Sequence, residues 1–452
     1  MSELLFKSLF DEDSFVKTLA FLHGNGTGGD GSDECVTGYG SIDQRLVFAA
    51  VDSQDDRPAV HGTVFIRKVI RTLDAAIAHK APFMLSINGS LSDISGGAEV
   101  LYEYSGLLES VKRASGKIPL IFIVRGDCLG LNAALASMFD FVFLYGNDAS
   151  LSALSDTAVN IASNRNESVN KLKFDSEYTA LHSEAVTGIC EDIDALKQTL
   201  SSLFNYLPDS AVSGAPGSSY NAGKEYYSDD IVMLRGIELC RALSDGQLCF
   251  ETGSGYGTGL VTAFGKIFGR TAGFVSCDTG KTAGLIGTEA LKKLVRFLKY
   301  CINFNIPLVN LLDFTGVSAS DHDVFELPAV IADILTSSRH ANKCKAISIV
   351  TGSACGMLAP VFIKRRELDA CNISLAWEGT YIDAIDPAAA ALMRYEDDIR
   401  SDPDPAAARQ KYIAIYKTQN SSALAAAGKG LIDDIIEPAE TRLRIAAFLN
   451  IL

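Results

Sequence analysis

The chain has 452 residues, 48% of them hydrophobic and 21% charged, a balance typical of a globular protein with a large core, and its length favours two or three domains. Its 40 basic and 55 acidic side chains give a net charge of −15, which argues against binding to a nucleic-acid backbone. We find no apolar run that could span a membrane, and the acidic segment at residues 1–15 does not resemble a signal peptide. We therefore expect a cytoplasmic protein without direct membrane insertion.

The ten cysteines and six histidines are scattered and form no recognisable metal-binding motif. In the cytoplasm the cysteines are expected to be reduced thiols, and no metal site is predicted.

The chain contains an internal repeat. Residues 36–45 lead into an apolar strand at 46–51, an amphipathic helix is predicted over 63–80, and apolar strands follow at 82–87 and 118–126. The same series recurs at residues 261–276, 287–303, 307–312 and 345–352. Arg45 and Arg270 are 225 positions apart, as are Lys68 and Lys293, so the two series keep one register. We interpret the chain as two copies of one domain.

Each copy alternates strands with helices, which predicts α/β domains whose sheet faces are covered. We place the domains at residues 1–215 and 216–452, with a linker near residues 212–220. Glycine-rich stretches at 23–30 and 253–259 precede the matching strands, whereas a phosphate-binding loop follows its strand. They are predicted to be hairpin or connecting loops.

The strand-turn-helix segments at residues 118–139 and 345–365 carry the strongest functional signal. In each, an apolar strand is predicted to end near a glycine, at Gly126 or Gly352, before a turn leads through Gly130 or Gly356 into a helix. Unpaired N–H groups at a helix start can stabilise an oxyanion. Alternatively, these glycines only permit tight packing of the strand against the helix.

Other candidates have simpler structural explanations. Gly352–Gly356 lacks the GxSxG spacing of a hydrolase, so a nucleophilic Ser353 or Cys355 is disfavoured. Asp313 is expected to be a cap. The remaining polar candidates are expected in solvated loops or on exposed helix faces: His322, Glu326, Lys68 and Lys293.

Four segments resemble the carboxyltransferase subunits of biotin-dependent acyl-CoA carboxylases and decarboxylases. They lie at residues 36–43, 293–309, 376–377 and 430–442. The resemblance implies two tandem crotonase-like domains, each a spiral of ββα units. It also implies that a carboxyl group moves between carboxybiotin and the α-carbon of a short acyl-CoA thioester, with no side-chain base required.

The resemblance also implies where the site lies, between the first domain of one subunit and the second domain of another. Backbone amides at Gly130 and Leu131 are expected to hold the thioester oxygen. Those at Gly356, Met357 and Leu358 are expected to hold the ureido oxygen of biotin. The family has glycine or alanine where Leu131, Met357 and Leu358 stand, so bulk is added beside these amides.

The loops expected to bind substrate also differ from the family. Residues 89–96, which begin at Gly89, replace a Gly-Ala-Arg-Ile-Gln-Glu-Gly run, and Thr315-Gly316-Val317 replaces Pro-Gly-Phe. These differences leave two alternatives open: a non-catalytic scaffold paralogue, or a crotonase-type acyl-CoA enzyme that does not use biotin.

The expected partners follow from what the sequence lacks. No methionine precedes a lysine, so the usual biotin-attachment dipeptide is absent and biotin is expected on a separate biotin carboxyl carrier protein. Biotin carboxylase or decarboxylase subunits are further expected partners. The resemblance implies a homo-oligomer, either a dimer or a hexamer.

Overall fold

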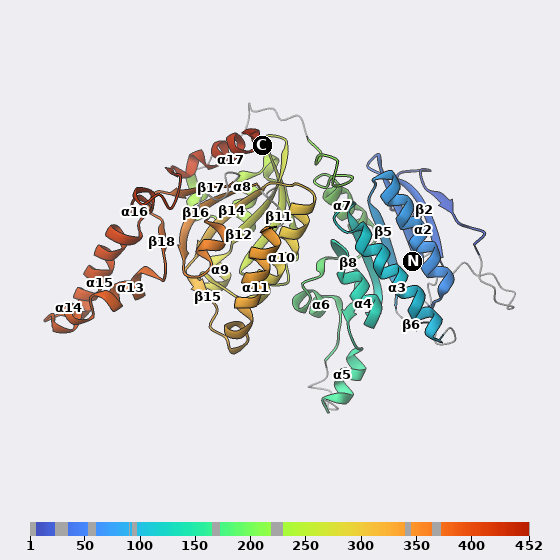
Figure 1. Cartoon of the computed structure of the whole chain (residues 1–452), viewed down its shortest axis with the longest axis horizontal. Coiled ribbons are helices and arrows are strands. Elements are labelled where there is room, and N and C mark those ends of the chain that lie inside the picture. Colours follow the sequence, from blue (N-terminus) through green and yellow to red (C-terminus); the bar gives the residue numbers. More distant parts are fainter. Residues whose placement is uncertain are drawn as a thin grey trace. The chain divides into compact units, whose positions relative to one another are not determined.

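The computed structural model of the chain describes residues 6–22, 35–52, 60–89, 91–92, 97–164, 172–217, 229–339, 345–363 and 372–451. These residues form two compact units, Met1–Ala215 and Pro216–Leu452, each built around a β-sheet with helices packed on it (Figure 1). Each unit is described separately below.

In the first unit, the described residues form a seven-stranded sheet in the order β1-β2-β3-β5-β7-β8-β9. Its strands are β1 (Val16–Thr18), β2 (Cys35–Ile42), β3 (Arg45–Asp52), β5 (Phe83–Asn88), β7 (Leu120–Leu129), β8 (Phe141–Ser152) and β9 (Val186–Cys190). Strands β2 and β3 form an antiparallel hairpin, and β3, β5, β7, β8 and β9 are parallel. A separate short pair joins β4 (Val60–His61) to β6 (Leu91–Ser92).

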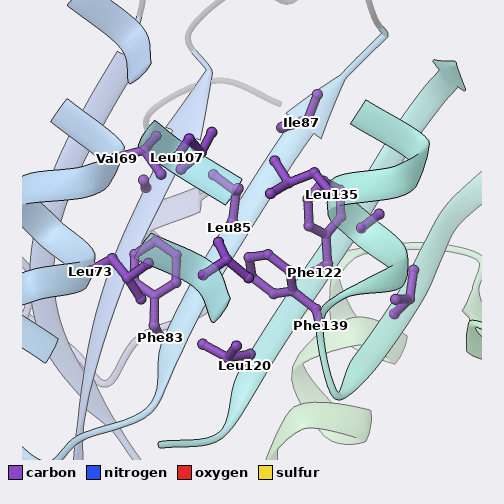
Figure 2. Close-up of a cluster of buried hydrophobic side chains, with 14 of the residues drawn as sticks. Val69, Leu73, Phe83, Leu85, Ile87, Leu107, Leu120, Phe122, Leu135 and Phe139 are labelled. Atoms are coloured by element: carbon purple, nitrogen blue, oxygen red, sulfur yellow. The ribbon is translucent and has the colours of Figure 1, made fainter. Parts of the chain in front are cut away.

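Except for the short helix at residues 156–162, whose one buried residue is Asn160, the helices of the first unit pack apolar residues on this sheet. They are α2 (Thr63–His79), α3 (Gly97–Ala114), α4 (Gly130–Ser137), α5 (Asp156–Ala162), α6 (Ser176–His182) and α7 (Ile193–Phe204). In α2, Val69 and Leu73 lie one turn apart, and both are fully buried against the sheet. Figure 2 shows them beside Phe83 and Leu85 of β5, with Leu107 of α3 in the same cluster.

In the second unit, the sheet has eight described strands, in the order β10-β11-β12-β14-β16-β17-β19 with β18 paired to β16. They are β10 (Cys249–Thr252), β11 (Leu260–Ile267), β12 (Arg270–Cys277), β14 (Leu308–Phe314), β16 (Ala346–Cys355), β17 (Asn372–Trp377), β18 (Tyr381–Asp383) and β19 (Asp434–Ile436). Strands β10, β11 and β12 are antiparallel neighbours, and the strands from β12 to β19 are parallel. A short parallel pair joins β13 (Leu285–Ile286) to β15 (Gly316–Val317).

Many α-helices of the second unit lie in the C-terminal part of its sequence, after residue 386. They are α8 (Gly236–Leu243), α9 (Thr279–Thr282), α10 (Thr288–Asn303), α11 (Asp321–Arg339), α12 (Ala359–Phe362), α13 (Pro387–Arg394), α14 (Glu396–Ser401), α15 (Pro405–Tyr416), α16 (Ala423–Gly428) and α17 (Thr441–Ile451). Apolar side chains of α8 and α17, among them Leu239 and Phe448, join strand residues such as Phe274 in one buried core.

The predicted repeat of strands and helices is confirmed. Strand hairpins form at β2–β3 and β11–β12, amphipathic helices at α2 and α10, and parallel strands at β5, β7, β14 and β16. Residues 253–259 connect β10 to β11 in an antiparallel hairpin, as predicted. The glycine-rich stretch at 23–30 lies outside the described residues.

Two strand ends differ from the prediction. Strand β7 continues past Gly126 to Leu129, and β16 continues past Gly352 to Cys355. Both strands shift register against a neighbour at this point, and β7 then pairs with residues 150–152 of β8. The extension depends on these neighbours, and each strand leads directly into a glycine, Gly130 or Gly356.

Candidate functional site

In the first unit, the candidate site lies where β7 meets α4. Gly130 is the first residue of α4 and has a φ of 58°. A Cβ atom added there would meet nothing within 4 Å, so the backbone at Gly130 faces open space. The N–H groups of Gly130 and Leu131 have no acceptor within the helix, because they belong to its first turn. The Leu131 side chain is 41% exposed and is not part of the buried core.

Gly89 lies at the same carboxyl edge of the sheet, directly after β5. Its N–H donates to the Arg125 carbonyl of β7 at 2.8 Å, so this amide is already satisfied. Ser90 and residues 93–96 of the predicted substrate loop lie outside the described residues.

A buried ion pair stabilises this edge of the sheet. Arg125 and Asp52 pair side chain to side chain with almost no exposure, and Arg125 Nε donates to Ser86 Oγ at 2.9 Å. The Asn88 N–H donates to Asp52 Oδ2 at 2.5 Å. The ends of β3, β5 and β7 are therefore tied together beside Gly89 and Gly126.

In the second unit, the equivalent site follows β16. Gly356 has a φ of 84°, which favours glycine, and its N–H donates to the Asp383 carbonyl at 3.0 Å. Within the described residues, the N–H groups of Met357 and Leu358 make no hydrogen bond. Of the three amides expected to contact biotin, these two have no acceptor among the described residues, and only that of Met357 belongs to a residue with exposed surface. The Met357 side chain is 47% exposed, whereas Leu358 is buried in the core.

Gly316 lies against Gly356. A Cβ added at Gly356 would be 3.9 Å from the Cα of Gly316. The structure therefore brings together two residues of the second unit that sequence analysis placed in the site. The helix that follows, α12, has only four residues, Ala359–Phe362, and Pro360 lies in its first turn, where proline is tolerated.

A cavity of about 590 Å³ opens at the same edge of the second sheet. It is bordered by the β10–β11 loop, by the start of α10 and by the loop after β15, and its lining includes Gly257, Thr282, Leu285, Thr288, Ser318 and Asp323. Burial alone would raise the pKa of Asp323, but hydrogen bonds from Ser318, Ser320 and Thr288 hold that pKa well below its usual range. The cavity therefore contains a carboxylate that already caps α10 through the Thr288 N–H at 2.7 Å.

Lys68 and Lys293 correct the prediction of exposed helix positions. Their exposed fractions are 2% and 5%, and both ammonium groups bind backbone carbonyls beside the strand that opens their repeat. Lys68 Nζ donates to the Cys35 carbonyl at 3.2 Å, and Lys293 Nζ to those of Gly253 and Tyr256 at 3.2 and 2.7 Å. A lysine on an apolar helix face can be buried when carbonyls satisfy its donors. The recurrence of lysine at one register in both copies is the signal that could have revealed this.

The remaining candidates take no part in a nucleophilic site. Burial raises the pKa of Cys355 to about 11, so this thiol stays protonated at neutral pH. Glu326 forms an ion pair with Lys292 at 2.8 Å on the surface. The side chain of His322 lies outside the described residues. Asp313 contacts Arg235 and the backbone of Ser353, and is not a helix cap.

Two further features are absent from the described residues. No group of three or more His, Cys, Asp or Glu side chains is placed to hold a metal ion. No helix there combines the length and the apolar character that crossing a membrane requires.

Comparison with known proteins gives one family over nearly the whole chain. The carboxyl transferase domain matches residues 6–452. The chain is 26% identical to the methylmalonyl-CoA carboxyltransferase 12S subunit of Propionibacterium freudenreichii subsp. shermanii, covering 100% of this chain and 87% of that one. It is 24% identical to the methylmalonyl-CoA decarboxylase subunit alpha of Propionigenium modestum, covering 98% and 88%.

A solved structure extends this likeness to the fold. The transcarboxylase 12S structure, described as a hexamer assembly with methylmalonyl-coenzyme A and methylmalonic acid bound, aligns with a TM-score of 0.89 and 25% identity. The alignment covers 100% of this chain and 88% of the other. The predicted pair of crotonase-like α/β domains is thereby confirmed.

Proposed function

Because the chain belongs to the carboxyl transferase family, we propose that it moves a carboxyl group between carboxybiotin on a separate carrier protein and the α-carbon of a short acyl-CoA. It is a biotin-dependent acyl-CoA carboxyltransferase. The named relatives act on methylmalonyl-CoA, so we infer that methylmalonyl-CoA and propionyl-CoA are the substrate pair.

The observation that carries the proposal is the doubled strand end, where main-chain amides without hydrogen-bond partners follow a strand in each unit. In the first unit, the amides of Gly130 and Leu131 lie at the start of an eight-residue helix beside open space. They would stabilise negative charge on the thioester oxygen while the α-carbon loses a proton or a carboxyl group. In the carboxylation direction, the biotin ring nitrogen that gives up CO2 would take the α-proton, and these two amides would hold the enolate charge until the α-carbon bonds to the CO2.

In the second unit, the Met357 amide would hold the ureido oxygen of biotin, joined by the Leu358 amide once that buried residue becomes accessible. Both N–H groups lack a partner among the described residues, and the two glycines at 316 and 356 leave backbone exposed beside them. When bound, carboxybiotin supplies the carboxyl group. The residues of this chain orient the ring and stabilise the charge that develops on its oxygen, so no acid–base pair of side chains is needed.

We further infer an oligomer with partner subunits. The structure neighbour is described as a hexamer and as a multienzyme core, which supports a hexamer over a dimer for this chain. A biotin carboxyl carrier protein would then deliver biotin, and a biotin carboxylase or a decarboxylase subunit would complete the reaction.

The test uses the purified chain with methylmalonyl-CoA, malonyl-CoA and free biotin or a biotinylated carrier. Loss of the carboxyl group from methylmalonyl-CoA that requires biotin is the expected result. Binding of the carrier without turnover of either thioester would support a scaffold instead. Thioester turnover in the absence of biotin would support a biotin-independent enzyme, and either outcome would contradict the proposal.

A further inference from the structure

Asp313 occupies an irregular position in the second sheet. Strands β14 and β16 pair regularly up to Leu312 and Val350, and the next pair is Phe314 with Ala354. One residue of β14, Asp313, therefore lies opposite three residues of β16. Such a bulge leaves backbone N–H groups without partners in the strand ladder.

The Asp313 carboxylate fills this bulge. Its Oδ1 accepts the Ser353 N–H at 2.9 Å. A Cβ added to Gly352 would lie 2.1 Å from the same oxygen, so only glycine leaves room for the carboxylate at this point. The shape of β16 between Thr351 and Ser353 is thus matched to the Asp313 side chain.

Arg235 fixes the other oxygen of Asp313. Its Nε donates to Asp313 Oδ2 at 3.0 Å, and the exposed fractions of the two side chains are 29% and 13%. The Arg235 guanidinium also donates to the Val232 and Leu234 carbonyls at 2.5 and 2.7 Å. Because several bonds hold the arginine, the carboxylate has one defined position.

The first unit has a related arrangement at the equivalent strand ends, made of different residues. Asn88 corresponds to Asp313, and Gly126 to Gly352, and a Cβ on Gly126 would be 3.1 Å from Asn88 Oδ1. The charges there belong to Asp52 and Arg125, which are replaced by Cys277 and Thr351 in the second unit. The two halves therefore have separate ion pairs beneath their candidate sites.

We propose that Asp313, held by Arg235, is a positioning residue that sets the Met357 and Leu358 amides for biotin and has no role in binding acyl-CoA. The proposal rests on the proposed function. Ser353 is three residues before Gly356, and residues 353–355 also pair with β18. Loss of the carboxylate would free the Ser353 N–H, relax the bulge and move the following turn. A displacement of about 1 Å at a reactive site can reduce a rate by about 10²-fold.

A second ion pair in the same unit provides a matched control. Asp245 pairs with Arg442 at 2.6 Å and accepts the Phe268 and Gly269 N–H groups at 2.9 and 2.7 Å. This pair braces the turn between β11 and β12, at the opposite edge of the sheet from Gly356. Asp245→Asn therefore removes a comparable charge pair from the same unit without touching the biotin side.

The kinetic experiment compares Asp313→Ala, Asp313→Asn, Arg235→Met and Asp245→Asn in the full chain. We expect Asp313→Ala to lower the biotin-dependent rate by about 10- to 100-fold, with the KM for acyl-CoA unchanged. Asp313→Asn should fall between wild type and Asp313→Ala, because its amide oxygen can still accept the Ser353 N–H. Adding Arg235→Met to Asp313→Ala should cost nothing more. An unchanged rate in Asp313→Ala, or the same loss in Asp245→Asn, would overturn the proposal.

A second measurement decides the inference even if wild type shows no transfer, an outcome that would contradict only the proposed function. Hydrogen exchange in Asp313→Ala should accelerate at Ser353 and Gly356, whose N–H groups are hydrogen-bonded, and stay unchanged at the hydrogen-bonded Gly89 amide of the first unit. Uniform acceleration over the second unit, or no change at Ser353, would show that the carboxylate does not set this turn.

Discussion

Lys293 carries a buried positive charge whose partners are main-chain carbonyls. Burial lowers the pKa of Lys293 to about 8, while the nearby Glu251 carboxylate acts in the opposite direction. An unfolded lysine has a pKa near 10.4, so between these values the unfolded chain binds more protons than the folded chain. The Lys293 contribution to the free energy of unfolding must therefore rise with pH in this window.

Lys293→Met removes this titration while keeping a side chain of similar length. The free energy of unfolding of wild type, minus that of Lys293→Met, should rise by up to about 3 kcal/mol from pH 7.5 to 10.5. Urea unfolding followed at several pH values measures it. A difference that stays constant or falls over this range would show that Lys293 is protonated throughout.

From the sequence, residues with an unusual backbone could be identified more easily than the environment of individual side chains. Gly130, Gly316 and Gly356 could be identified because glycine at a strand end signals an unusual backbone. The burial of Lys68 and Lys293 could not be predicted from helical periodicity alone, because it depends on carbonyls 33 to 40 positions away.

Among the elements, the β10–β11 loop is shaped by its contact with α10. Gly257 has a φ of 54°, and a Cβ there would lie 2.7 Å from the Cα and N atoms of Ala290. Lys293, from the same helix, binds carbonyls of this loop. The glycine-rich segment thus serves close packing of the loop on a helix start and borders the cavity.

Gly379 provides a control for this contact. It has a φ of 81°, but a Cβ there would meet nothing within 4 Å. Gly379→Ala should cost about 1–2 kcal/mol for the left-handed backbone alone, and Gly257→Ala about 1–3 kcal/mol more because of the clash. Thermal or urea unfolding measures both variants. Equal losses would mean that the loop moves away from α10 at no cost.

The elements could be predicted where hydrophobic periodicity, or glycine and proline at their ends, marked them, as for α2, α10 and the hairpins. The irregularities at Gly126 and Asp313 could not, because a register shift depends on which strands become neighbours. The short α12 also depends on tertiary context, since Gly356 bonds to Asp383 of β18.

At the scale of the whole chain, the duplication includes an equivalent contact between an arginine and a helix C-terminus in each unit. Arg45 of β3 donates through Nη1 to the Phe204 carbonyl at the end of α7, and Arg270 of β12 donates through Nη1 to Leu449 near the end of α17. Arginine at a helix C-terminus satisfies carbonyls that lack intrahelical partners. The two arginines that revealed the repeat in sequence have the same role in both units.

Because each unit has its own buried core, a cavity made in one core should destabilise only that unit. Leu107→Ala removes a side chain from the buried cluster of the first unit, and Leu311→Ala one from that of the second. Each should cost about 2–5 kcal/mol and lower hydrogen-exchange protection in its own sheet only. Exchange mass spectrometry of β5 and β7 against β14 and β16 resolves the two, and loss of protection in both sheets from one change would show a single cooperative unit.

Stabilisation of the substrate's charge by main-chain N–H groups can be tested with Leu131→Pro. Proline is tolerated in the first turn of a helix, so this change removes the amide donor and leaves α4 in place. Leu131→Ala is the control, because it removes the side chain and keeps the N–H. We expect biotin-dependent carboxyl transfer to fall by about 10²- to 10³-fold in Leu131→Pro and to be largely retained in Leu131→Ala. Equal activity in the two folded variants would contradict it.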